Sequence, residues 1–326
     1  MKKLIGALKV IVPLSLGIYL AWYSFDSIQD KDKVASVLNR ANYLFIAFSV
    51  LFSWFSHFTR ALRWKYLLEP MGYKTNVWNN YHAVMIGYFM NLLLPRAGEV
   101  SRAGMMTRYE KVPFEKAFGT ILAERVVDVF MLGTISLITI FMQYDKFELL
   151  KKKLDDLGSG QTKNSGSSWT SYIVYVVAAL AIAGLVLYII NPKIRAKVNA
   201  ILKGLADGLL AILRLKKRWE FIGLTVLIWV LYIGLYIVCF YSIEETSQIE
   251  FKGLMLGFLG GSLGIILVQG GVGVYPMLVA SALTLYGADH DIVIALGWVT
   301  WAAQTILLVV AGAISFYLMP RINNDL

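Results

Sequence analysis

The feature that most constrains the fold is a series of long apolar stretches, each of about 17–25 residues and so able to cross a bilayer as a helix. One opens the chain, MKKLIGALKVIVPLSLGIYLAWYSF, and the others cover residues 43–59, 117–142, 170–190, 220–241 and 292–318. Hydrophobic residues make up 58% of the chain and charged residues only 16%, which excludes an ordinary soluble enzyme. We therefore expect an all-α polytopic membrane protein, with residues 1–326 forming one integral-membrane domain.

Two further apolar regions, residues 82–108 and 253–287, are broken by Gly and Pro into segments too short to span. Loop charges indicate their placement, because Lys and Arg accumulate on the cytoplasmic side of a membrane. The basic loops 1–9, 60–80 and 191–219 are expected on the cytoplasmic side. The acidic loop 242–252 is expected on the outer side. All four fit if each broken region is a re-entrant helical hairpin, which gives six full crossings and puts both termini in the cytoplasm. If the hairpins span fully, there are eight crossings, and the basic loop 143–169 fits poorly in the six-crossing arrangement.

The two broken regions resemble each other. GYFMNLLLPRAGEV starts at Gly87 and GFLGGSLGIILVQGGVGV at Gly257, and each runs from a Gly-aromatic pair through a short apolar helix to a Pro or a Gly cluster. Pseudo-repeat halves at about 43–142 and 220–318 would then be inverted in the membrane. Paired, interrupted segments of this kind point to a transport site near the midplane. Close packing of Gly-rich helices produces the same pattern.

Charged residues follow the first break. Arg96, Glu99 and Arg102 come directly after Pro95, and a helix there would put Glu99 and Arg102 on one face. Ionisable groups at membrane depth are costly, so we read them as candidate substrate-binding residues. An interfacial loop with snorkelling arginines is the alternative reading.

A second charged group, AERVVD, lies inside the long apolar stretch 117–142. Glu124 and Asp128 share a helical face at a spacing of four residues, and Arg125 lies three residues before Asp128. At that depth they need partners within the protein, most simply the opposite charges of the hairpin. They are candidates for substrate binding, although a purely structural ion network would have the same sequence.

The second half offers less charge. Gly270, Gly271 and Gly273 would let backbone N–H groups approach an anion such as a phosphate, and Gln304 lies in the final long apolar stretch. We include these four among the candidate substrate-binding residues. A Gly cluster alone is weak evidence for such a site, and tight packing explains any single one of these glycines better.

Arg60, Arg63 and Trp64 end the second apolar stretch on its cytoplasmic side. Their spacing allows both arginines to face one lipid phosphate, with the indole at headgroup level, so we expect a headgroup or interface site. Simple anchoring is the alternative. Residues 194–214 are amphipathic, as expected of a helix that lies on the inner leaflet.

Cofactor and metal chemistry has no support in the sequence. The three His residues are scattered, and no zinc-protease, nucleophile-elbow or nucleotide-binding motif is present. Cys239 is the single cysteine, which excludes a disulfide framework. The net charge of +10 falls in short runs beside apolar segments and is explained by topology rather than by nucleic-acid binding. We expect no cofactor, no metal and no enzymatic activity.

Taken together, RALRWKYLLEPMG, NLLLPRAGEVSR and LAERVVD resemble, in their order and spacing, the lysylphosphatidylglycerol synthase transmembrane family. The QGGVGV segment is similar to a Pro/Gly-Gly-x-Gly segment of that family, although Gln269 stands where Pro is common and Tyr275-Pro276 follows where an acidic residue often does. The resemblance implies a bacterial or archaeal cytoplasmic-membrane protein that moves phospholipid headgroups between leaflets. Family members that make aminoacyl lipid carry a soluble transferase domain, which this sequence lacks, so we do not expect that activity.

The leading hypothesis is therefore a flippase for a phospholipid or a lipid-linked substrate. A non-transporting partner that presents lipid to a glycosyltransferase or another lipid-modifying enzyme is the second hypothesis. A membrane transferase using Glu124 and Asp128 is the third, and no donor-binding motif accompanies that pair. The sequence does not indicate the lipid, the direction, the energy coupling or the oligomeric state.

Overall fold

The computed structural model describes residues 15, 17–94, 97–144 and 188–323. In these ranges all regular structure is helical, which confirms the all-α fold class. The chain forms two compact units, the first made of Met1–Arg125 and Leu215–Leu326 and the second of Val126–Arg214. Helix α6 (Phe114–Met142) runs through the boundary between them.

Four helices in the described ranges are long and apolar enough to cross a membrane. They are α3 (Tyr43–Leu68), α6, α10 (Arg218–Phe240) and α14 (His290–Ile322). These confirm helices of spanning length at four of the six expected crossings. Of the other two expected stretches, 170–190 lies almost wholly outside the described residues. The N-terminal stretch is described only from residue 15, with a helix at 17–26.

Two pairs of short helices correspond to the broken regions. The first pair is α4 (Val77–Leu93) and α5 (Ala97–Glu110), and the second is α12 (Phe251–Leu267) and α13 (Val274–Thr284), separated by the 3-10 turn η2 (Gln269–Gly271). Asn76 caps α4 by accepting a hydrogen bond from the backbone N–H of Trp78 at 2.8 Å. At 17 residues each, α4 and α12 fall short of the roughly 20 residues that a full crossing needs.

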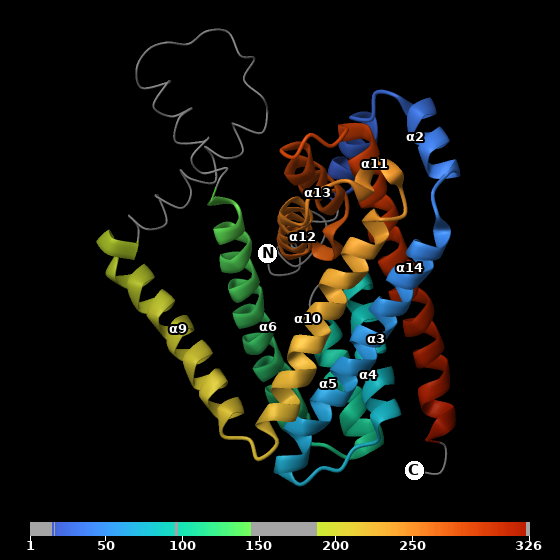
Figure 1. Cartoon of the computed structure of the whole chain (residues 1–326). Coiled ribbons are helices and arrows are strands. Elements are labelled where there is room, and N and C mark those ends of the chain that lie inside the picture. The colour runs from blue at the N-terminus through green and yellow to red at the C-terminus, as the bar shows by residue number, and fades with distance from the viewer. Residues whose placement is uncertain (1–14, 16, 95–96, 145–187, 324–326) are drawn as a thin grey trace, which may run out of the picture. The chain divides into compact units, whose positions relative to one another are not determined.

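The two pairs lie toward opposite ends of the first unit (Figure 1). The first half of α14 packs on α13, where Gly297 meets Pro276, and its second half packs on α4, where Gly312 meets Phe89. The inner ends of the pairs approach each other, because Gly270 of η2 lies near Leu92 of α4. Both pairs therefore end near the middle of the long helices.

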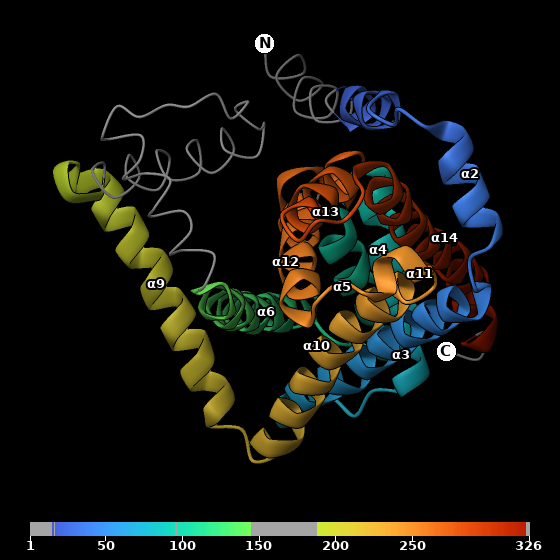
Figure 2. The ribbon, with the colours of Figure 1, turned by 45° about the horizontal axis from the view of Figure 1, so that its top comes forward.

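Helices α3 and α10 run side by side along the first unit (Figure 2). The first half of α3 is joined to α14 through Ser49 and Gln304, whose amide nitrogen donates to the hydroxyl at 3.2 Å. Its second half faces α4, α5 and the start of α6. The remaining short elements of this unit are α2 (Lys31–Asn39), η1 (Glu69–Met71) and α11 (Glu244–Ser247).

The second unit contains the later part of α6 and helix α9 (Pro192–Leu213). The side chain of Asn191 caps α9, and Pro192 occupies the first turn, where its missing N–H costs nothing. The helix predicted for residues 194–214 is thus confirmed, while its place on the inner leaflet stays a prediction.

Candidate functional site

The last turns of α3 point charged side chains into the helix bundle. Arg60, Arg63 and Trp64 are all buried, and Arg63 and Trp64 are 0% exposed. This corrects the expectation that they face lipid at headgroup level. They continue the buried polar face of α3 that begins with Ser53 and Ser56, so protein covers them.

Glu124 of α6 is the centre of a buried ion cluster, which we define as Arg63, Arg102 and Glu124. Its Oε2 lies 2.7 Å from Nη1 of Arg102, and its Oε1 lies 3.4 Å from Nε of Arg63. Arg63 also donates from Nη1 to the hydroxyl of Thr225 on α10 at 3.2 Å. The cluster thus joins α3, α5, α6 and α10, and it confirms that the charge inside α6 finds its partner in the hairpin.

Arg102 is held with one edge of its guanidinium free. Its Cζ lies 3.6 Å from the ring centroid of Trp64, a cation–π contact, and the indole N–H donates to Thr120 at 2.8 Å. Nη1 faces Glu124, whereas Nε and Nη2 are buried and have no hydrogen-bond partner among the described residues. Because the residue is only 6% exposed, leaving these two donor nitrogens without partners costs free energy that is unusual for a buried cation.

Glu99 and Arg125 form a second ion pair, outside the buried ion cluster. The carboxylate Oε1 of Glu99 accepts from Nη2 of Arg125 at 2.8 Å. The two side chains are 22% and 43% exposed, so this pair is more accessible than the cluster. It again joins α5 to α6.

Glycine brings α4 and α5 into backbone contact beside these charges. A Cβ on Gly98 would clash with the carbonyl oxygen of Gly87, and the backbone N–H of Gly98 donates to Oδ1 of Asn91 at 2.8 Å. A small cavity lies at this contact, lined by Asn91, Glu99, Arg102 and Arg125 among others. Its free volume of about 10 Å³ holds roughly one water molecule. A larger guest therefore requires α4 and α5 to move.

Aromatic and imidazole groups continue the polar site along α3. His57 is buried, with its ring centroid 4.8 Å from that of Tyr88 and 6.3 Å from that of Tyr232. Arg60 donates from Nη2 to the Tyr232 hydroxyl at 3.2 Å. These groups extend the site from the ion cluster toward the middle of α3.

The candidate residues of the second half serve packing contacts in this structure. Gly270, Gly271 and Gly273 have φ angles of 69°, 70° and 72°, which glycine adopts without strain. The carbonyl of Gly270 accepts from the indole N–H of Trp301 at 2.6 Å, and Gly273 lies against the backbone of Ala21.

Two predicted residues cannot be joined to the site. Arg96 lies outside the described residues. Asp128 is half-buried on α6, one turn beyond Glu124, and belongs to the second unit. Within the described ranges, no three His, Cys, Asp or Glu residues are grouped closely enough to hold a metal ion.

A family model decides the relationship of the chain to known proteins. The model described as the lysylphosphatidylglycerol synthase TM region matches residues 10–312. The chain belongs to this family. It is therefore a multi-pass membrane protein, and the family match covers both pairs of short helices and the buried ion cluster.

Two relatives of this family member are UPF0104 membrane proteins of archaea. The one from Methanocaldococcus jannaschii is 29% identical over 116 residues, which are 34% of either chain. The one from Methanothermobacter thermautotrophicus is 24% identical over 119 residues, 35% of either chain. The alignment thus spans about a third of each relative's length. No solved structure matches the chain.

Several residues of the site were missed from the sequence. Asn91, Thr120 and Thr225 are polar residues within apolar helices and carry no charge to signal a role. His57 and Tyr232 are far apart in the chain, and only the side-by-side packing of α3 and α10 brings them together. A buried polar face on α3, with Ser53, Ser56, His57 and Arg60 at helical spacing, was the available signal.

Proposed function

We propose that this protein is a flippase that moves a phospholipid or a lipid-linked substrate between leaflets. The observation that carries the proposal is the free edge of Arg102, a buried guanidinium whose Nε and Nη2 have no hydrogen-bond partner among the described residues. Arg102 also lines the small cavity between α4 and α5. The printed name of the family, which refers to a phospholipid synthase, supports a lipid as the substrate.

A phosphate suits this edge. Nε and Nη2 of arginine point in parallel and match two oxygens of one phosphate, a bidentate and charge-assisted arrangement. Trp64 and Glu124 fix the plane of the guanidinium, so little side-chain entropy is lost when the phosphate binds. Arg102 would thus capture the headgroup while the acyl tails stay in lipid.

The Glu99 and Arg125 pair would serve as the entrance. Its partial exposure lets an incoming headgroup exchange with the pair, the phosphate taking Arg125 and an amine taking Glu99. The cavity at Gly98 is too small for a headgroup, so entry would require the α4–α5 contact to open. The structure would then represent the closed state of the site.

The order of helices supports transport. In each half, at 43–142 and 220–318, a long helix is followed by two short ones and another long one, and α4 and α12 have the same length of 17 residues. We infer an inverted repeat whose short helices are re-entrant hairpins from opposite faces, with the termini in the cytoplasm. Such repeats place substrate sites where the broken helices meet.

A dithionite-quenching assay tests this function. Purified protein is reconstituted into vesicles containing NBD-labelled lipids of different headgroups, and the protected inner-leaflet fraction is measured. The expected result is protein-dependent loss of that fraction for at least one phosphate-bearing lipid. The Arg102→Gln/Glu124→Gln double variant should abolish the loss.

The double variant is chosen because it removes Arg102 together with the carboxylate that pairs with it, while Arg63 keeps its hydrogen bond to Thr225. Arg108→Gln is the matched control, because Arg108 lies on the same helix but is exposed. An unchanged protected fraction with every lipid tested would overturn the flippase proposal. Co-purification of a lipid-modifying enzyme with such an inactive protein would favour the partner hypothesis instead.

A further inference from the structure

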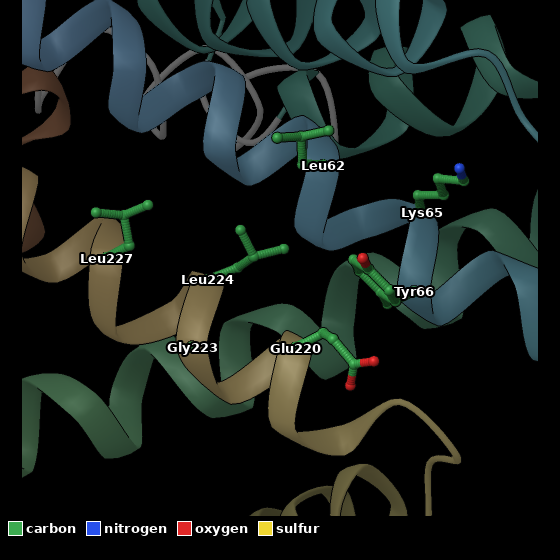
Figure 3. Close-up of a pocket in the computed structure, with 7 residues that line it drawn as sticks. All are labelled: Leu62, Lys65, Tyr66, Glu220, Gly223, Leu224 and Leu227. Carbon is green, nitrogen blue, oxygen red and sulfur yellow. The ribbon is translucent and has the colours of Figure 1, made fainter.

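A groove runs along the outside of the contact between α3 and α10 (Figure 3). Its volume is about 370 Å³, within the range of about 300–1,000 Å³ that is usual for ligand pockets. Side chains from both helices surround it, with the three leucines toward one end and Lys65, Tyr66 and Glu220 toward the other. It is separate from the small cavity at Arg102.

The groove changes from polar to apolar along its length. Lys65 and Tyr66 lie in the last turn of α3, and Glu220 lies in the first turn of α10, so the polar end coincides with the ends of two candidate membrane spans. Leu224 and Leu227 follow one and two turns deeper, roughly 6 and 10 Å from Glu220 at 1.5 Å per residue. This is the polarity profile of a phospholipid lying parallel to the helices.

The polar end carries both signs of charge. Lys65 and Lys217 each contact the carboxylate of Glu69, at 3.4 and 3.1 Å, and the ammonium of Lys217 lies 5.4 Å from the ring centroid of Tyr66. Glu220 is exposed. A phosphate would compete with the carboxylate of Glu69 for the two ammonium groups and could also accept from the phenol hydroxyl, and Glu220 suits a neighbouring amine.

The inner side of the same helix contact leads to the candidate site. Arg63 follows Leu62 on α3, and its hydrogen bond to Thr225 closes the space between α3 and α10 behind the groove. The guanidinium of Arg63 also lies over the ring of Phe221 on α10, with its Cζ 5.4 Å from the centroid. A lipid in the groove would therefore be separated from the buried ion cluster by the packing of α3 on α10 around Arg63.

We infer that the groove binds one phospholipid with a zwitterionic, amine-bearing headgroup, the phosphate at Lys65 and Tyr66, the amine at Glu220 and an acyl chain along Leu62, Leu224 and Leu227. As a waiting position for the transported lipid it rests on the proposed function, whereas lipid binding itself does not. The flippase would then take zwitterionic phospholipids as substrates from the leaflet at the polar end of the groove.

Gly223 allows a clean test, because it lines the groove and a Cβ added there would have no neighbour within 4 Å. Gly223→Trp should fill the groove without disturbing the helix contact. Gly119→Trp is the matched control, since Gly119 is also an exposed helical glycine with open space at its Cβ.

The experiment is photolabelling in nanodiscs with phosphatidylethanolamine that carries a diazirine in its acyl chain, followed by peptide mapping. Adducts should concentrate on residues 62–66 and 220–227, above the level at the exposed apolar positions Phe48, Leu51 and Phe55 of α3. Gly223→Trp should reduce them to that level, and Gly119→Trp should leave them unchanged. Equal labelling of groove and reference positions, or labelling that survives Gly223→Trp, would overturn the inference.

The headgroup is tested with the same probe chain on phosphatidylglycerol, which is anionic and lacks the amine. Wild-type protein should label more with the ethanolamine lipid, and Glu220→Gln should remove that preference. A preference for phosphatidylglycerol, or one that Glu220→Gln does not alter, would overturn the zwitterionic assignment.

The dithionite assay on the same variants separates the two proposals. Flipping that continues at the wild-type rate in Gly223→Trp would leave the flippase proposal standing and refute the groove as its waiting position. Groove labelling by a wild-type protein that flips no lipid would refute the flippase proposal and leave a lipid-binding groove.

Discussion

Arg102 combines features that rarely occur together in one side chain: it is buried, stacked on Trp64, paired to Glu124 through one nitrogen and unpartnered at two others among the described residues. A guanidinium that served only to fix the hairpin would gain most by using all its donors. The two unused donors of Arg102 are what we expect of a group that binds a ligand and not of a purely structural ion pair. The substitutions below separate these roles residue by residue.

Breaking the buried ion cluster on one side should be strongly destabilising. Arg102→Gln leaves the carboxylate of Glu124 with one guanidinium of the cluster, and loss of one partner of a buried pair costs about 3–5 kcal/mol. In the Arg102→Gln/Glu124→Gln double variant, part of that loss should be recovered, because no carboxylate is left beside the missing guanidinium, although Arg63 then loses Glu124 as an ion partner. Unfolding in detergent measures both, and additive losses in the double variant would show that the two side chains do not act as a pair.

Substitution of Gly98 by alanine should destabilise the protein, whereas the same substitution at Gly104 should not. Gly98→Ala places a methyl group against the carbonyl of Gly87 and forces α4 and α5 apart, whereas Gly104 on the same helix has open space around its Cβ. Gly104→Ala should be neutral or stabilise by up to about 1 kcal/mol, from helix propensity alone. Thermal unfolding of the two variants in parallel tests this, and equal midpoints would mean that the glycine contact is not tight.

At the scale of elements, an ion pair joins helix α2 to the N-terminal end of α14. Lys33 of α2 donates to Asp289 at 2.6 Å, and Asp289 also caps α14 by accepting from the backbone N–H groups of Asp291 and Ile292. The hydrogen bond from Lys33 holds the pKa of Asp289 below its ordinary value of 3.8. The carboxylate therefore stabilises the fold above that pH and loses its contribution as the pH falls through its lowered pKa.

Asp289→Asn should lower the unfolding midpoint at pH 7, because an amide keeps the helix cap but loses the charge opposite Lys33. The difference from wild type should shrink as the pH falls from 3.8 through the lowered pKa of Asp289, because the native carboxylate is then protonated as well. Unfolding midpoints of the two proteins across this range provide the measurement. A difference that is constant with pH would attribute the effect to the cap instead of the ion pair.

The hairpin elements predict a labelling pattern for four positions. In a Cys239→Ala background, cysteines at Lys74 and Lys111 flank α4 and α5, and cysteines at Gln248 and His290 flank α12 and α13. A membrane-impermeant maleimide should label the first two from one side and the last two from the other. Labelling of Lys74→Cys and Lys111→Cys from opposite sides would show that this region crosses the membrane.

At the scale of the whole molecule, apolar length was sufficient to predict the all-α membrane fold and the four helices of the described residues that are long enough to cross a membrane. The pairing of α6 with the first hairpin also followed, since buried charges need opposite partners. The position of Arg60, Arg63 and Trp64 did not, because basic and aromatic residues near the end of an apolar stretch look like a lipid interface. Only the extension of α3 to Leu68 and its packing on α10 and α6 place them inside.

The polar neighbours of the buried ion cluster also could not be predicted from the sequence. Asn91 and Thr225 become part of the site through contacts between helices distant in the chain, and single polar residues in apolar helices are common. The glycines of the second half illustrate the converse case. Their positive φ angles were foreseeable from a Gly cluster, but their close contact with Trp301 and Ala21 depends on the tertiary fold.

We propose that the guanidinium of Arg102 binds the headgroup phosphate during transfer between leaflets. The most direct measurement compares the dithionite-quenching rate of wild-type protein with that of Arg102→Lys, which keeps the charge opposite Glu124 but loses the bidentate edge. We predict intact folding and a rate lower by about 10- to 100-fold, as expected for the loss of a hydrogen bond to a charged group worth about 1.5–3 kcal/mol. Equal rates in two equally folded proteins would contradict the account.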